Sequence, residues 1–212
     1  MYFEVTKRTI DIAGGLVLLL VFSPIILITA IAIKVSSLGP VFADTPMRIG
    51  KDGKLFYLYK FRSMVVNAHN LLRKDPRFRK LYTEYKKSSF KLREDPRVTN
   101  VGKFIRRHSI DEIPQLINVL RGEMSIVGPR PYYPDELTQQ TAKYPRTKKL
   151  LKEVLSVRPG ITGFWQVSGR SEVNFDKRIE MDAYYARKRS IWLDILILLK
   201  TPWAMIFGKG AI

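Results

Sequence analysis

Two neighbouring carboxylates, Asp111 and Glu112, stand inside a basic stretch that runs from Arg106 to Pro131. Arg106 precedes the acidic pair and Arg130 follows it. An ionised carboxylate beside clustered arginines suits chemistry on a phosphate, provided that the arginines bind the phosphate and do not merely neutralise Asp111. The alternative is that the two acids only cap a helix while the arginines face solvent, because acidic residues are common in first turns.

The residues after the acidic pair have the spacing of an amphipathic helix that ends at Gly122, where a left-handed cap is cheap. The apolar positions with this spacing are Ile113, Leu116, Ile117 and Leu120. Two starts remain open: Ser109 as N-cap with Glu112 completing a capping box, or Asp111 as N-cap with Pro114 in the first turn. In both cases Asp111 lies at a helix N-terminus, and we expect the helix dipole and the arginines to keep it ionised.

The composition limits the other kinds of chemistry. The chain has 212 residues, enough for one domain or a domain with an appendage, and a net charge of +18. Such a charge indicates an anionic partner, which could be nucleic acid, anionic lipid or a phosphorylated substrate. There is no cysteine, so disulfides, thiolate nucleophiles and cysteine-based metal sites are excluded, and the two histidines cannot form a histidine-rich zinc site. No nucleic-acid-binding motif is recognisable, so we expect no nucleic-acid partner.

The N-terminal part contains an uncharged run over residues 12–33, the length of a transmembrane helix. It is too long for a signal peptide and lacks a small-residue cleavage site before Lys34. Ser23 and Pro24 interrupt the run: proline removes a backbone hydrogen bond, and Ser23 can bond to a freed carbonyl.

Basic residues flank this run on both sides, and basic flanks favour the cytoplasm. They are Lys7 and Arg8 before it, then Lys34, Arg48, Lys51 and Lys54 after it. Both flanks can be cytoplasmic only if the segment enters the membrane and returns. We therefore predict a re-entrant, broken helix over residues 1–35 and a cytoplasmic domain over residues 36–212, with an ordinary kinked span as the alternative.

The remaining segments predict mostly helices around a small sheet. Short β-prone runs between glycine turns place the sheet within residues 41–62, and Lys60 and Arg62 flank a phenylalanine at its end. Residues 66–97 are rich in cations and read as a mobile basic arm over a site, a lipid-binding patch or a solvated face. Residues 136–156 and 174–189 read as helices.

The C-terminal third adds a glycine-rich stretch and an apolar helix. Arg158 to Arg170 includes three glycines, which permit close backbone approach to a ligand or form a tight structural turn. The apolar segment 191–207, which contains Trp192 and Trp203, is predicted to lie in the membrane surface, with a buried core helix as the competing interpretation. The fold class is therefore α+β, mainly α, with amphipathic interfacial helices.

Taken together, these motifs resemble the bacterial sugar transferases that act on polyprenyl phosphate, the monotopic phosphoglycosyl transferases. The matching residues are Lys7-Arg8 with Asp11, Ser23-Pro24, the run Lys60 to Met64, Arg106 to Pro131, Arg158 to Arg170, and Asp182 to Tyr185. The resemblance covers essentially the whole chain, and it is to the short form of the family.

The resemblance implies an enzyme that transfers a sugar 1-phosphate from a UDP-sugar to undecaprenyl phosphate and releases UMP. It implies that Asp111 is the nucleophile and forms an aspartyl phosphosugar, that Glu112 supports it, and that Mg²⁺ is required and contacts Asp111. Arg106 and Arg130 match phosphate-binding positions, and the pair Ser23-Pro24 matches the break that makes the helix re-entrant.

The resemblance also assigns the other motif residues. Lys60, Arg62, Arg158, Gln166, Arg170 and Asp182 match substrate-binding positions, and Lys7, Arg8 and Asp11 match residues near the membrane face of the site. The implied place is the cytoplasmic face of a bacterial inner membrane rich in anionic lipids, at the first membrane step of exopolysaccharide, O-antigen or another glycoconjugate. The stretch around Gln166 is closer to members that transfer galactose or glucose phosphate than to the N-acetylated group.

A competing class is a non-enzymatic, basic peripheral membrane protein that binds anionic lipids. It accounts for the charge and for the apolar ends, but not for two carboxylates inside a basic stretch. The sequence does not determine the glycan pathway or the oligomeric state.

Overall fold

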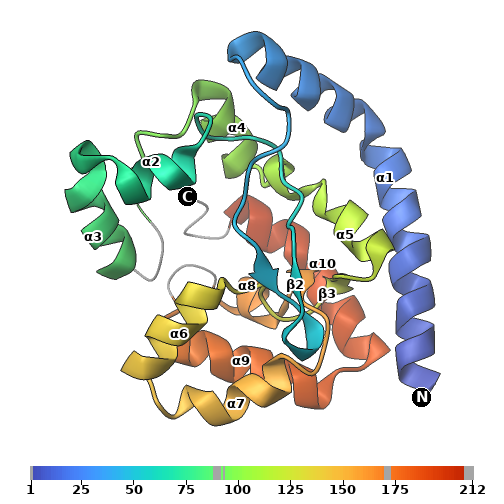
Figure 1. Ribbon diagram of the computed structural model, residues 1–212. Helices are drawn as coiled ribbons and strands as arrows, with labels where there is room; N and C mark the ends of the chain where they lie inside the picture. The colour runs from blue at the N-terminus through green and yellow to red at the C-terminus, as the bar shows by residue number, and fades with distance from the viewer. Residues whose placement is uncertain (1, 88–91, 93, 170–172, 208–212) are drawn as a thin grey trace.

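The computed structural model describes residues 2–87, 92, 94–169 and 173–207. Their fold is mainly helical, as predicted, and contains two small sheets where one was expected (Figure 1). The helices are α1 (Tyr2–Ser36), α2 (Ala68–Lys74), α3 (Arg79–Lys87), α4 (Asn100–Arg107), α5 (Gln115–Arg121), α6 (Pro134–Lys143), α7 (Thr147–Val154), α8 (Phe164–Ser168), α9 (Phe175–Lys188) and α10 (Ile191–Phe207). Short 3₁₀ turns cover Lys51–Gly53, Pro76–Phe78 and Ile110–Glu112.

Helix α1 contains the apolar run, and it is the one described helix that is long and apolar enough to cross a membrane. Pro24 lies inside it, and Ser23 Oγ donates to the carbonyl of Leu20 at 2.7 Å, the carbonyl that loses its partner to proline. The helix stays continuous and bends midway, so that its C-terminal half leans over α4 (Figure 1). The predicted hydrogen bond of Ser23 is confirmed, and the re-entrant arrangement stays a prediction.

The sheets lie at the centre of the molecule. Strands β1 (Arg48–Ile49) and β2 (Leu55–Phe56) form an antiparallel pair within the predicted range. Strands β3 (Ser125–Val127) and β4 (Gly160–Thr162) form a parallel pair that the sequence analysis did not anticipate.

The glycine of β4 explains why the two strands approach so closely. A Cβ added to Gly160 would lie 2.0 Å from the backbone nitrogen of Gly128. Gly160 therefore permits two backbone segments of the protein to approach each other closely. At this position the glycine of the stretch 158–170 serves a tight structural contact and not an approach to a ligand.

Three clusters of buried apolar residues connect the elements. One lies between β2, α5, β3, α9 and α10; one lies between α6, α7 and α9; and a smaller one joins the end of α1 to α4. Figure 1 shows α6, α7 and α9 gathered at the bottom of the molecule, with α2 and α3 projecting at the upper left. The predicted polar helix over residues 136–156 is observed as two helices, because residues 144–146 separate α6 from α7.

Polar contacts fix the N-terminal half of α1 to this body. Lys7 Nζ lies 2.6 Å from Asp194 Oδ2 of α10. Arg8 donates to the carbonyls of Val119 and Leu120 at the end of α5, where the helix leaves carbonyls without helical partners. Asp11 accepts from the hydroxyl of Ser125 and from the backbone N–H that follows it.

Helix α10 has features both of a buried core helix and of a helix that lies in the membrane surface, the two interpretations that the sequence allowed. Asp194 and Ile197 are buried against the body, whereas Trp192, Leu199 and Trp203 are about 70 % exposed. Together with the exposed apolar side chains of α1, this gives the molecule an extensive apolar surface, which marks an interaction with a membrane or another apolar partner.

Candidate active site

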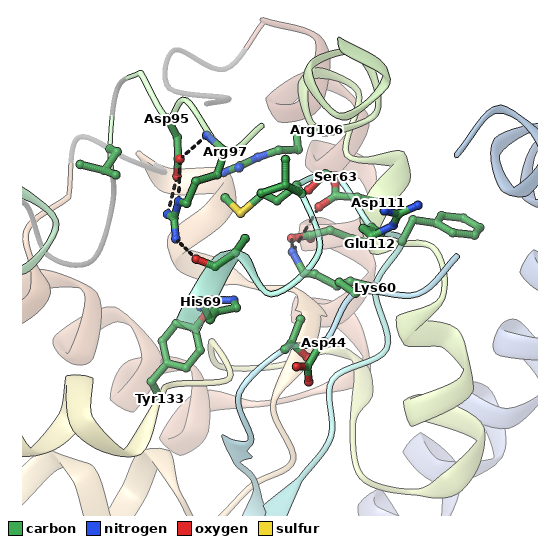
Figure 2. Close-up of a pocket in the computed structure, with 18 of the residues that line it drawn as sticks. Asp44, Lys60, Ser63, His69, Asp95, Arg97, Arg106, Asp111, Glu112 and Tyr133 are labelled. Carbon is green, nitrogen blue, oxygen red and sulfur yellow. Dashed lines mark hydrogen bonds and ion pairs between the residues drawn. The ribbon is translucent and has the colours of Figure 1, made fainter. Parts of the chain in front are cut away.

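A cavity of about 310 Å³ lies between the loop before β1, the segment from Lys60 to His69, the turn that carries Asp111, and the residues after β3. This volume is within the range of small-molecule sites. Its charged lining residues are Arg48, Lys60, Arg62, Arg97, Arg106 and Arg130, with Asp44, Asp95, Asp111 and Glu112. In Figure 2 Lys60 reaches toward the acidic pair, while His69 and Tyr133 lie toward the other end of the cavity.

Asp111 is held in a 3₁₀ turn and not at the start of α5, so neither predicted helix start is observed. Ser109 is left-handed, with φ of 55°, and its side chain makes no capping hydrogen bond. Pro114 has no N–H with which to continue the helix backwards, so α5 begins at Gln115. The carbonyl of Asp111 accepts from Phe61 N–H at 3.0 Å, which fixes the turn beside Lys60.

Lys60 joins the two carboxylates. Its Nζ lies 2.6 Å from Glu112 Oε1 and 3.5 Å from Asp111 Oδ2. Burial works against the charged form of Glu112, but the ion pair with Lys60 and the charges of Arg130 and Arg48 together outweigh it, and the pKa of Glu112 is lowered. For Asp111, which is 7 % exposed, burial dominates over Lys60 and Arg106, and its pKa is raised.

The electrostatics therefore differ from the sequence expectation, in which a helix dipole and arginines kept Asp111 ionised. Burial favours its neutral form, and Lys60 is the leading influence that opposes burial. The two carboxylates therefore differ. Glu112 makes the shorter ion pair with Lys60, whereas Asp111 makes the longer contact and is the weaker acid.

The arginines of the cavity fall into two groups. Arg62 donates to the carbonyls of Ser37 and Leu38 after α1, and Arg97 pairs with Asp95, so both are already used within the protein. Arg48, Arg106 and Arg130 have no carboxylate within 4.0 Å in the part of the chain that the structure describes. These three guanidinium groups are available to an anion that enters the cavity.

Asp182 lies behind the cavity wall. It is fully buried and accepts from Arg130 N–H at 3.2 Å and from the hydroxyl of Tyr132 at 2.8 Å. Burial raises the pKa of Asp182 to about 7. Asp182 thus fixes the backbone that carries Arg130 and does not line the cavity itself.

The structure brings only some of the predicted residues together. Lys60, Arg62, Arg106, Asp111, Glu112, Arg130 and Gln166 line the cavity. Arg158 is outside its lining and donates to the carbonyl of Gly122 at 2.8 Å, and Lys7, Arg8, Asp11, Ser23 and Pro24 belong to α1 and its contacts described above. Arg170 lies outside the described residues.

Sequence reasoning missed several lining residues, among them Arg48, His69 and Tyr133. The sequence offered Arg48 only as one of the cations that flank the apolar run, but its side chain is buried against the Tyr133 ring. His69 was given no role by the sequence, yet it packs edge-on against Tyr133, and burial lowers its pKa to about 4. The position of Tyr133, three residues after Arg130, was the available signal.

The acidic pair fits Mg²⁺, which proteins often hold through one or two carboxylates together with substrate phosphates. Asp111 and Glu112 both line the cavity. Among the described residues no group of three or more acidic or histidine side chains forms a complete metal cage. The donor set thus suits an ion that arrives with a phosphate ligand.

The chain is similar to known proteins over nearly its whole length. The family model described as "Bacterial sugar transferase" matches residues 2–208. The chain is 42 % identical over 209 residues to the undecaprenyl-phosphate galactose phosphotransferase of Salmonella typhimurium, covering 97 % of this chain and 41 % of that protein. It is 40 % identical over 214 residues to the UDP-glucose:undecaprenyl-phosphate glucose-1-phosphate transferase of Escherichia coli, covering 97 % and 41 %.

A relative of similar length is the exopolysaccharide production protein ExoY of Rhizobium meliloti. It is 39 % identical over 207 residues, which cover 97 % of this chain and 87 % of that protein. Against the Salmonella and Escherichia relatives, by contrast, the chain spans about two fifths of their length.

Proposed function

The chain belongs to the bacterial sugar transferase family, and we propose that it transfers a hexose 1-phosphate from a UDP-sugar to undecaprenyl phosphate and releases UMP. The names of the Salmonella and Escherichia relatives support a polyprenyl phosphate acceptor and a galactose or glucose donor. The observation that carries the proposal is the cavity that holds Asp111 and Glu112 together with three guanidinium groups that have no carboxylate partner among the described residues.

Asp111 is the proposed nucleophile. Its carboxylate oxygen attacks the phosphorus that bears the sugar, and the bond from that phosphorus to the bridging oxygen breaks. The electron pair stays on the bridging oxygen, which leaves as part of UMP, and the sugar phosphate remains on Asp111 as an acyl phosphate. A phosphate oxygen of the lipid acceptor then attacks the same phosphorus, and the aspartate leaves as a carboxylate.

The other cavity residues prepare this step. Lys60 opposes the effect of burial on Asp111 and so increases the fraction that is ionised and able to attack. Arg106 and Arg130 are proposed to bind the diphosphate and spread its charge, a role that fixed cations perform best in a site closed to water. Mg²⁺ would be held by Asp111 and Glu112 together with phosphate oxygens, and it would neutralise charge on the diphosphate.

The lipid substrate implies a membrane, and α1 supports this. Its exposed apolar surface and the exposed tryptophans of α10 suit a lipid environment. We propose that α1 enters the membrane from the cytoplasmic side and returns, which holds the cavity at the depth of the phosphate headgroups. The net charge of +18 favours an anionic leaflet.

The test is UMP release from a panel of UDP-sugars by the purified protein with Mg²⁺ and undecaprenyl phosphate. We expect one UDP-hexose to support turnover, and Asp111→Asn to abolish it while retaining folding and vesicle binding. Asp111→Asn changes the charge by one unit only, so lipid binding by electrostatics survives. No release from any UDP-sugar, with vesicle binding intact, would favour the lipid-binding protein instead.

A further inference from the structure

Arg48 is a buried cation that has no assigned role in the proposed reaction. It belongs to β1, is 6 % exposed and lines the cavity. Arginine is seldom buried without a partner that carries the opposite charge. Within the described residues Arg48 has no such partner within 4.0 Å.

The guanidinium of Arg48 is held in a fixed orientation. Its Cζ lies 3.2 Å from the centre of the Tyr133 ring, and Nη1 donates to the carbonyl of Pro131 at 3.2 Å. Its Nε is buried without a hydrogen-bond partner. A planar, immobilised fork with an unused N–H is the geometry that binds phosphate through two hydrogen bonds.

Arg130 supplies a second guanidinium beside the first. A small cavity of about 60 Å³, adjoining the main one, is walled by Arg48, Lys60, Glu112, Arg130 and Gln166 among others. The Nε of Arg130 is also buried without a partner. Arg48, Lys60 and Arg130 thus bring three cations to this small cavity, where Glu112, which already pairs with Lys60, is the one carboxylate among the described lining residues.

The arginines divide between the two carboxylates. Arg106 and Asp111 line the main cavity but not the small one, whereas Arg48 and Arg130 line both cavities together with Glu112. A diphosphate offers two phosphates to this arrangement. The phosphate that reacts must lie at Asp111 and hence near Arg106, which leaves Arg48 and Arg130 to the neighbouring phosphate.

We propose that Arg48, with Arg130, binds the nucleotide-side phosphate of the UDP-sugar, the group that leaves as UMP. This deepens the proposed function and rests on it. As the bond to the bridging oxygen breaks, the electron pair remains on the nucleotide-side phosphate, and its negative charge grows. A fork fixed on Tyr133 stabilises that charge without having to reorganise.

The experiment measures the affinities of UMP and UDP by calorimetry, using the full chain in detergent with Mg²⁺. UMP carries only the nucleotide-side phosphate, so Arg48→Met should weaken UMP and UDP binding alike, by roughly 10- to 100-fold. Arg106→Met should weaken UDP binding more than UMP binding. Arg73→Met, an exposed arginine outside the cavity with the same loss of charge, should change neither.

A second variant protects the test against misfolding of Arg48→Met, which thermal unfolding would detect. Tyr133→Leu keeps Arg48 but removes the ring on which it stacks, and it should weaken UMP binding about threefold or more. The inference is overturned if folded Arg48→Met binds UMP as tightly as wild type, or if it loses affinity for UDP alone. Wild-type protein that binds neither nucleotide would instead overturn the proposed function itself.

Discussion

Lys60→Met should move the acidic limb of the activity profile to higher pH. In the structure Lys60 is the leading influence that opposes the effect of burial on Asp111. Without this cation the carboxylate is harder to form, because burial penalises the charged form and Arg106 is left as the main neighbouring cation. The folded-state pKa of Asp111 therefore rises, and the nucleophile is ionised only at higher pH.

The size of the shift follows from the distance between the charges. At 3.5 Å a pair of unit charges interacts by about 5 kcal/mol at an effective dielectric constant of about 20, and by about 1 kcal/mol in bulk water. These limits correspond to about 1 to 3.5 pH units. The side chains of Lys60 and Asp111 are 22 % and 10 % exposed, so we expect a shift of about 2 pH units, between the two limits.

The assay is kcat/KM for UMP release between pH 5 and pH 9, since this parameter reports ionisations of the free enzyme. Lys54→Met is the matched control, because Lys54 is exposed and its loss removes the same charge. Its acidic limb should stay where the wild type has it. A Lys60→Met enzyme that is slower at every pH but has an unshifted acidic limb would show that Lys60 contacts the substrate and does not set the ionisation of Asp111.

Two further predictions concern the buried polar groups that support the site. Asp182→Asn should flatten the pH dependence of stability. Because the folded-state pKa of Asp182 is raised to about 7, its contribution to stability falls by up to about 4 kcal/mol as pH rises from about 4 to about 7, and the amide cannot ionise. Thermal midpoints at pH 5 and pH 8 check this, and a variant with the same difference between the two midpoints as the wild type would contradict it. Lys7→Met should lower the free energy of unfolding by about 3–5 kcal/mol, because it leaves Asp194 buried without its cation. Adding Asp194→Asn should restore most of this loss, and a double variant no more stable than Lys7→Met would argue against the ion pair.

Local patterns in the sequence predicted the local structure well. The apolar spacing before Gly122 corresponds to α5, and Gly122 adopts the left-handed cap with φ of 81°. The expected helix over residues 174–189 is α9, and the bond from Ser23 to a carbonyl freed by Pro24 is present. Each of these features depends on residues within one or two turns, which is the range that a sequence pattern describes.

Features that depend on distant contacts were not predictable in the same way. The pairing of β3 with β4 joins segments more than 30 residues apart, and the close approach of Gly128 and Gly160 is visible only once they pair. The short turn at Asp111 arises because Phe61 binds its carbonyl. The burial that raises its pKa likewise comes from residues remote in sequence, so a helix-dipole argument favoured the opposite shift.

The candidate site shows the same division. The motif around Asp111 and Glu112 identified the acidic pair with Arg106 and Arg130, and the separate run Lys60 to Met64 contributed Lys60, and all of these line the cavity. It could not assign Arg48, because a lone arginine in a short strand reads like any surface cation until β1 and Tyr133 enclose it. It also could not separate Asp182, which supports Arg130 from behind, from residues that line the cavity.

The central claim is that Asp111 forms a covalent bond to the sugar phosphate. The most direct measurement is intact-protein mass spectrometry after mixing enzyme, Mg²⁺ and the UDP-sugar that supports turnover, with no lipid acceptor. We predict one sugar phosphate per chain, mapped to Asp111, with an equal amount of UMP released and the adduct lost when undecaprenyl phosphate is added. UMP release that requires both substrates at once, with no adduct on Asp111, would contradict it.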